Sequence, residues 1–291
     1  MFNYLKRKKM KKNIFAAPLL ALMMTALTSC DPSHDNESAI GAISSDQLTQ
    51  ELQITAKSAG NNNLTVFTTP TRYIKVYDAN TNSLMGTGTS VKIQIAPPTS
   101  EASFYAVTAA MDGNTSVKSG SKSITISEYT DLPAIYDKIF GDGAGGFTSH
   151  TWGWDATDNG GICWGNGAYL ENTAPGWWTV SINDIDEQAA GKGLPNDGKD
   201  GWMKMSLSGV STSRGDAGMV KVTEDVVKSG WDVGTMTFSG TTPLMGIQPN
   251  VGGNQYVYQI LKADGDHLYL CAPEPGAGDW GTAWFWCFKK Q

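Results

Sequence analysis

The stretch APGWWTVSI, residues 174–182, places two tryptophans side by side. Neighbouring side chains of a β-strand point to opposite faces. Trp178 therefore shares a face with Val180 and Ile182, whereas Trp177 shares the other face with a threonine and a serine. The pattern predicts a strand in which Trp178 lies in the core and Trp177 lies on the polar face.

The stretch GWMKMSLSG, residues 201–209, repeats this arrangement. Met203 and Met205 fall on an apolar face, and Trp202 begins the opposite, polar face. Soluble proteins usually bury most of a tryptophan, so a tryptophan on a polar face is informative. We therefore expect Trp177 and Trp202 to be accessible and to lie beside each other.

Short alternating runs separated by turn residues recur along the chain and predict an all-β protein. Residues 48–128 carry several such strands and no tryptophan, which predicts a small immunoglobulin/PKD-like sandwich acting as a spacer. All ten tryptophans lie between Trp152 and Trp286. Eight or more strand signals there predict a larger Trp-rich β-sandwich or jelly roll over residues 132–291.

A helix is expected where the two halves meet, in EYTDLPAIYDKIFGDG, residues 128–143. Asp131 is placed to cap its start, Pro133 fits the first turn, and Gly141 fits the end. The same stretch marks the predicted domain boundary.

The N-terminal segment, residues 1–29, has the order of a secretory signal: a basic start, an apolar run and small residues. It ends in LTSC, which resembles a lipobox, so Cys30 is the expected lipidation site. The apolar run is too short for a permanent membrane span. Residues 30–47 are polar and predict a flexible tether, so lipid on Cys30 is the expected membrane attachment.

The charge balance argues against a nucleic-acid partner. Residues 1–29 hold six of the 22 basic residues and none of the 28 acidic ones, so the remaining chain has a formal net charge of −12. A phosphate backbone would be repelled by this charge. Cys163, Cys271 and Cys287 match no zinc spacing and are best explained as small buried residues, although one disulfide is not excluded.

Exposed tryptophans favour a carbohydrate ligand. An indole offers a flat apolar plate, which matches the C–H face of a pyranose, and nearby polar side chains can hydrogen-bond the hydroxyl rim. The predicted ligand-binding residues are Trp177, Trp202, Trp280, Asn166 and Asp200.

The stretches TWGWD, WGNGAY, APGWW and AWFWCFKK, together with the lipobox and the acidic residues that follow it, resemble Bacteroidetes-type surface glycan-binding lipoproteins. These are similar to the accessory binders of starch-utilisation-type uptake systems. The resemblance implies a lipid anchor in the outer membrane, exposure at the cell surface, a glycan ligand, and an outer-membrane uptake machinery as partner.

Two other functions remain open. A glycoside hydrolase or lyase would need two carboxylates across a cleft, and NDIDEQ offers Asp184, Asp186 and Glu187, although a solvated acidic turn or short helix explains them better. An adhesive or structural lipoprotein would bury all its tryptophans. We expect no catalytic residues, no cofactor and no metal ligands, while a structural calcium ion held by backbone carbonyls stays open.

The lipoprotein assignment gives a direct test. We expect Cys30→Ala to move the protein from the membrane fraction to the soluble fraction, because the chain then lacks the residue that carries the acyl chains. Fractionation followed by immunoblotting measures this. A variant that stays in the membrane fraction after its signal has been cleaved contradicts the assignment.

Overall fold

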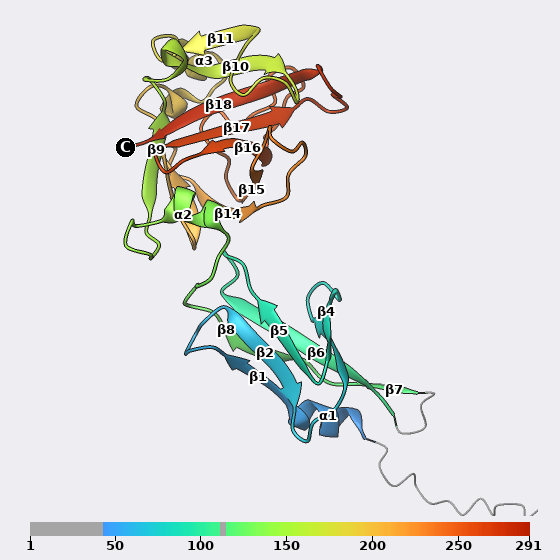
Figure 1. Cartoon of the computed structure of the whole chain (residues 1–291). Helices are drawn as coiled ribbons and strands as arrows, with labels where there is room; N and C mark the ends of the chain where they lie inside the picture. The colour runs from blue at the N-terminus through green and yellow to red at the C-terminus, as the bar shows by residue number, and fades with distance from the viewer. Residues whose placement is uncertain (1–42, 111–114) are drawn as a thin grey trace, which may run out of the picture. The chain divides into compact units, whose positions relative to one another are not determined.

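A computed structural model describes residues 43–110 and 115–291 of the chain (Figure 1). The predicted signal segment and Cys30 lie outside the described residues, as does most of the predicted tether. The described part is all-β, with short helices at a few connections. Among the described residues, no helix combines the length and apolarity needed to cross a membrane.

The first half forms two antiparallel sheets around one hydrophobic cluster. One sheet has the order β1-β2-β5, and the other has β4-β3-β6-β7 with β8 also paired to β6. Val66 and Ile93 from the first sheet pack with Val76 and Phe104 from the second. The elements are α1 Ser45–Glu51, β1 Leu52–Ala56, β2 Asn63–Thr68, β3 Ile74–Asp78, β4 Leu84–Gly88, β5 Ser90–Gln94, β6 Glu101–Ala109, β7 Ser116–Lys118 and β8 Lys122–Thr125.

The ordered structure begins before residue 48, where the tether was expected to end. Ser44 caps helix α1, since its Oγ accepts a hydrogen bond of 3.1 Å from the backbone N–H of Gln47. Ile43 and Leu48 are both buried. The last residues of the predicted tether therefore form a capped helix with apolar anchors.

The helix at the junction is confirmed, but its predicted cap is wrong. Helix α2 covers Ala134–Phe140 with Pro133 at the N-cap and Gly141 at the C-cap. Asp131 lies too early to reach the helix, and its carboxylate is 2.7 Å from Lys57 Nζ instead. Thr130 likewise donates its backbone N–H to Asn62 at 2.8 Å, so residues up to 131 are bonded to the first half.

The second half is built on a closed barrel. Eight strands pair in the order β18-β17-β16-β15-β14-β13-β12-β9, and β9 pairs back to β18. Strands β10 and β11 extend the sheet outside this ring (Figure 1). The elements are β9 His150–Trp154, β10 Ile162–Ala168, β11 Trp178–Ser181, α3 Ile185–Gly191, β12 Trp202–Ser206, β13 Gly209–Thr212, β14 Ala217–Thr223, β15 Gly234–Ser239, β16 Val257–Ala263, β17 His267–Pro273 and β18 Thr282–Lys290, with 3-10 turns η1 Asn159–Gly161 and η2 Pro195–Asp197.

This barrel refines the sequence-based fold. The strand-rich second half is confirmed, but its sheet closes on itself, whereas a jelly roll keeps two sheets. Closure leaves no free edge among the eight ring strands. Aromatic side chains fill the interior, where Tyr258 packs edge-on against Trp286 at a ring-centroid distance of 5.0 Å.

The two halves have separate hydrophobic clusters, one over residues 52–126 and one over residues 135–288. We therefore expect fragments 43–131 and 132–291 to fold independently, because each keeps its complete cluster. Thermal unfolding of each fragment by circular dichroism measures this. The two-domain interpretation is wrong if neither fragment unfolds cooperatively.

Candidate functional site

The turn between β10 and β11 lies directly on β10, and two glycines make this approach possible. A Cβ at Gly165 would lie 2.1 Å from the carbonyl oxygen of Trp178. A Cβ at Gly167 would lie 2.9 Å from the side-chain oxygen of Asn172. The glycines of WGNGA therefore allow the backbone of the following turn and of β11 to pack closely against β10.

Asn166 fixes this turn rather than simply facing a ligand. Its side-chain oxygen accepts the backbone N–H of Trp178 at 3.0 Å, and its backbone carbonyl accepts the N–H of Trp177, also at 3.0 Å. Asn172 closes the other side by accepting the N–H of Ala168 at 2.7 Å. The predicted binding residue Asn166 is half-buried, and the hydrogen bonds give it a positioning role.

The prediction that Trp178 is a core residue is wrong. Val180 on the same face is buried, but the Trp178 side chain is 40% exposed. Strand β11 is the outermost strand of the sheet and pairs with β10 alone, so less of the structure covers its first residue. Trp178 packs edge-on against Trp164 and Trp284 at ring-centroid distances of 5.6 and 5.8 Å.

Trp177 is accessible as predicted, with 53% of its surface exposed. It lies in the turn immediately before β11. The two adjacent tryptophans are therefore both exposed, one in the turn and one at the start of β11.

Trp280 is the most exposed tryptophan, at 64%. Its backbone has a positive φ of 61°, which is an outlier for a bulky residue. Hydrogen bonds maintain this conformation, since the Trp280 N–H donates to the Tyr169 carbonyl at 3.1 Å and the Tyr169 N–H donates to the Gly281 carbonyl at 2.8 Å. The β17–β18 turn is thereby attached to the chain that follows β10.

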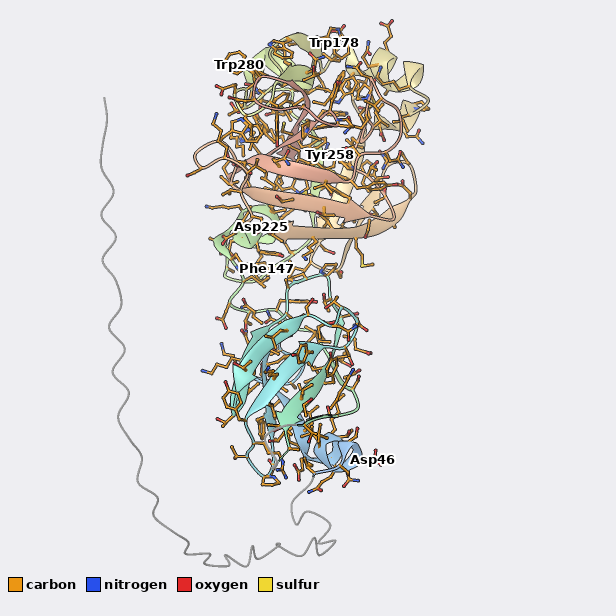
Figure 2. The ribbon with its side chains drawn as sticks, turned by 90° about the vertical axis from the view of Figure 1, so that its right-hand side faces the viewer. Asp46, Phe147, Trp178, Asp225, Tyr258 and Trp280 are labelled. Atoms are coloured by element: carbon orange, nitrogen blue, oxygen red, sulfur yellow. The ribbon has the colours of Figure 1, made fainter. Side chains whose placement is uncertain are left out.

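Trp177 and Trp280 therefore lie in two linked turns, and Trp178 begins β11 directly after the first of them. We call this end of the barrel the tryptophan end. The strand register supports this, because Asn166 on β10 lies opposite both Trp178 and Trp284. Figure 2 shows Trp178 and Trp280 at the same end of the second half.

Trp202 is accessible as predicted, with 37% of its surface exposed. It does not lie beside Trp177, which contradicts the expectation. Strand β12 pairs with β9 and β13, and Trp202 lies opposite Gly153. Strand β11 pairs with β10 instead, and its Trp178 end points away from the β9–β10 connection. Trp202 therefore belongs to a different part of the barrel surface.

Asp200 is exposed and lies near Trp202 rather than at the tryptophan end. It lines a small hollow with Asp186, Asn196 and Ser213. The predicted site residues thus divide into two groups, with Trp177, Trp280 and Asn166 in one and Trp202 and Asp200 in the other.

Asp279, directly before Trp280, is an exposed acid at the tryptophan end, whereas Glu171 and Glu274 nearby have partners. Glu171 lies 2.9 Å from Lys228 Nζ. Glu274 accepts hydrogen bonds from Trp284 Nε1 at 3.1 Å and from Asn250 at 2.6 Å. These contacts tie Glu171 to Lys228 and Glu274 to Trp284 on β18.

The candidate hydrolase acids lie elsewhere, at the start of α3, which confirms the short helix expected for NDIDEQ. Asp184 accepts the hydroxyl of Ser181 at 2.6 Å, and Asp186 lies 3.7 Å from Lys199 Nζ. These exposed contacts fit a solvated helix start rather than a catalytic pair across a cleft.

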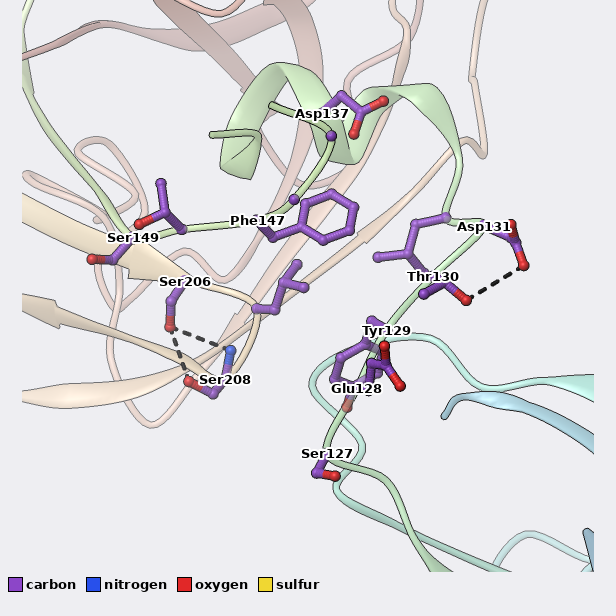
Figure 3. A pocket seen from close by; sticks show the side chains of 15 residues that line it. Ser127, Glu128, Tyr129, Thr130, Asp131, Asp137, Phe147, Ser149, Ser206 and Ser208 are labelled. Carbon is purple, nitrogen blue, oxygen red and sulfur yellow. Dashed lines mark hydrogen bonds between the residues drawn. The ribbon is translucent and has the colours of Figure 1, made fainter. Parts of the chain in front are cut away.

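A hollow of about 890 Å³ is lined by residues 127–132, 145–149 and 206–208, with Asp137 (Figure 3). Tyr129 and Phe147 are its aromatic residues, and no tryptophan lines it. Ser206 and Ser208 bond each other there at 3.0 Å. The hollow therefore lacks the indole plates that characterise the tryptophan end.

The cysteines behave as the sequence indicates. Cys163, Cys271 and Cys287 are free and buried. Burial raises the pKa of the Cys163 thiol to about 12, which keeps it protonated and unreactive.

Compared with protein-family models and with curated proteins, the sequence matches none.

The close approach at Gly165 predicts a specific sensitivity. We expect Gly165→Ala to lower the free energy of unfolding by about 2–4 kcal/mol, because a methyl group at this positive φ collides with the backbone of Trp178 at the start of β11. Gly252→Ala is the control, since it shares a positive φ but has no atom within 4 Å, and should cost only about 1 kcal/mol. Urea unfolding compares them, and equal losses would contradict the close approach.

Proposed function

We propose that this chain is a lipid-anchored, cell-surface glycan-binding protein whose tryptophan end holds the sugar. The observation that carries the proposal is the exposure of Trp177 and Trp280 on two turns that are hydrogen-bonded to each other, together with the exposure of Trp178 at the start of β11. Exposing three large indoles to water is unfavourable for an isolated protein, and such patches mark binding surfaces.

The chemistry of the tryptophan end suits a sugar ring. Each indole offers a plate for the C–H face of a pyranose and an N–H for a hydroxyl. The turns that present the indoles are fixed by Asn166 and Tyr169. Little conformational entropy is then lost when a glycan binds.

The remaining parts of the proposal come from the sequence. Lipid on Cys30 attaches the protein to the outer membrane, and the first half, as an immunoglobulin/PKD-like module, acts as a spacer. Tethering beside an outer-membrane uptake machinery raises the local glycan concentration for that machinery.

Binding is favoured over hydrolysis because Glu171 and Glu274 serve other contacts and are not available to pair with Asp279, the exposed acid next to Trp280. Glu171 pairs with Lys228, and Glu274 bonds Trp284. A glycosidase needs two carboxyl groups placed about 5–9 Å apart across the scissile bond. Release of reducing sugar from a bound polysaccharide would instead support the hydrolase.

Affinity electrophoresis of the chain from residue 31 against a polysaccharide panel tests the proposal. With a retained glycan, we expect Trp177→Ala and Trp280→Ala each to weaken binding about 5- to 150-fold, by analogy with the 1–3 kcal/mol of aromatic stacking on nucleobases. Their melting temperatures should change little, because both side chains are exposed.

Trp202→Ala is the matched control. Its indole is also exposed but lies beside Gly153 on another part of the barrel, so binding should be unchanged. A loss in Trp202→Ala with no loss in the other two variants would move the site to β12. Retention of no polysaccharide by the wild-type chain would contradict glycan binding.

A further inference from the structure

A compact group of polar side chains lies where the chain crosses from β9 to β10. Asp155 and Asp158 on this connection face His267 and Tyr269 at the start of β17. The His267 Nε2 atom lies 3.5 Å from Asp158 Oδ2 and 3.8 Å from Asp155 Oδ2. The three potential ligand atoms all lie within 4.8 Å of one another.

Asp264 fixes the orientation of the His267 ring through its Nδ1 atom. Its Nδ1 atom lies 3.0 Å from Asp264 Oδ2. Asp264 is itself fixed by the backbone N–H groups of Asp266 and His267, at 3.0 and 2.7 Å. A carboxylate at Nδ1 places the proton there in a neutral imidazole, so that the lone pair is on Nε2.

The Nε2 lone pair then faces the carboxylates of Asp155 and Asp158, and no hydrogen-bond donor lies between them. The Nε2 atom is shut off from solvent and has no hydrogen-bond partner. Tyr269 has one hydroxyl proton, yet its oxygen lies 2.6 Å from Asp155 Oδ2 and 3.1 Å from Asp158 Oδ2. The centre of the group therefore lacks positive charge. This is costly at Asp155 and at Nε2, which are buried, while Asp158 is partly exposed to solvent.

The surrounding charges do not remove this deficit. Lys262 lies 3.0 Å from Asp158 and 3.4 Å from Asp264, so one lysine stands against three carboxylates. Lys289 lies at the outer edge, where it donates to the Thr157 hydroxyl at 2.9 Å. A net charge of about −2 remains around a neutral His267, which a divalent cation would neutralise.

We propose that Asp155, Asp158 and His267 bind one divalent transition-metal ion of the zinc type, with Asp264 as the outer carboxylate that orients the imidazole. Ligand atoms around tetrahedral zinc are roughly 3.4 Å apart for bonds of 2.0–2.1 Å. The distance from Nε2 to Asp158 matches this spacing at 3.5 Å, and Asp155 at 3.8 Å would move closer by about 0.4 Å. An imidazole with two carboxylates favours zinc over calcium or magnesium, which prefer all-oxygen sites.

The ion would join the β9–β10 connection to the start of β17. Asp155 and Asp158 come from the connection, and His267 lies more than a hundred residues later. A bond between these segments stabilises the folded state, because the separated ligands of the unfolded chain bind the ion weakly. The site is independent of glycan binding.

Calorimetric titration of ZnCl2 into the chelator-treated, full-length chain tests the proposal. We expect one zinc ion per chain and a rise in melting temperature, with no rise from CaCl2. His267→Gln and Asp158→Asn should each weaken zinc binding at least tenfold. Asp266→Asn is the matched control, because this neighbouring acid is exposed and faces Lys290 instead, and it should bind zinc as the wild type does.

The measurement on the wild-type chain decides the proposal even if a variant fails to fold. Absence of zinc binding by the wild type overturns it, as does binding that is equal in the wild type, His267→Gln and Asp158→Asn. A melting temperature that depends on pH and on His267 but not on zinc also overturns it, because a protonated imidazole then supplies the missing charge.

Discussion

Strand β18 changes partner along one of its edges, and the second half of the chain is organised around this change. Residues 288–290 pair with β9, whereas residues 282–286 pair with β10. The other edge pairs with β17 throughout. The pairing with β9 closes the ring of eight strands, so the chain after Trp154 must leave the ring before it returns to β18 as β10.

Both candidate sites follow from this partner change. Because β10 and β11 lie outside the ring, β11 is an edge strand and its first residue, Trp178, stays partly exposed. The connection between β9 and β10 also has to pass over the start of β17, which brings Asp155 against Tyr269. One topological feature thus presents the indoles at one end of β10 and gathers the acids at the other.

The sequence predicts the strands and their faces well but not what covers each face. Period two correctly places Met203 and Met205 inside and Trp202 outside. The same rule assigns Trp178 to the face of Val180. It cannot predict that this strand lies outside the ring, where Trp178 remains partly exposed. The acidic group on the β9–β10 connection could not be predicted from the sequence for another reason. Asp155 and His267 are brought together by the register of β18 with β9 and with β17.

Rigidity links the fold to the proposed binding. A glycan gains most from aromatic plates that are already in place, since each side chain ordered on binding costs about 0.5–1.5 kcal/mol. Trp280 keeps an unfavourable backbone conformation because Tyr169 and Gly281 bond around it. Trp178 is braced by Trp164 and Trp284. The barrel therefore supplies the stability that lets this end expose strained and apolar groups to water. Such a combination of a stable scaffold with strained, exposed residues is expected at a functional site.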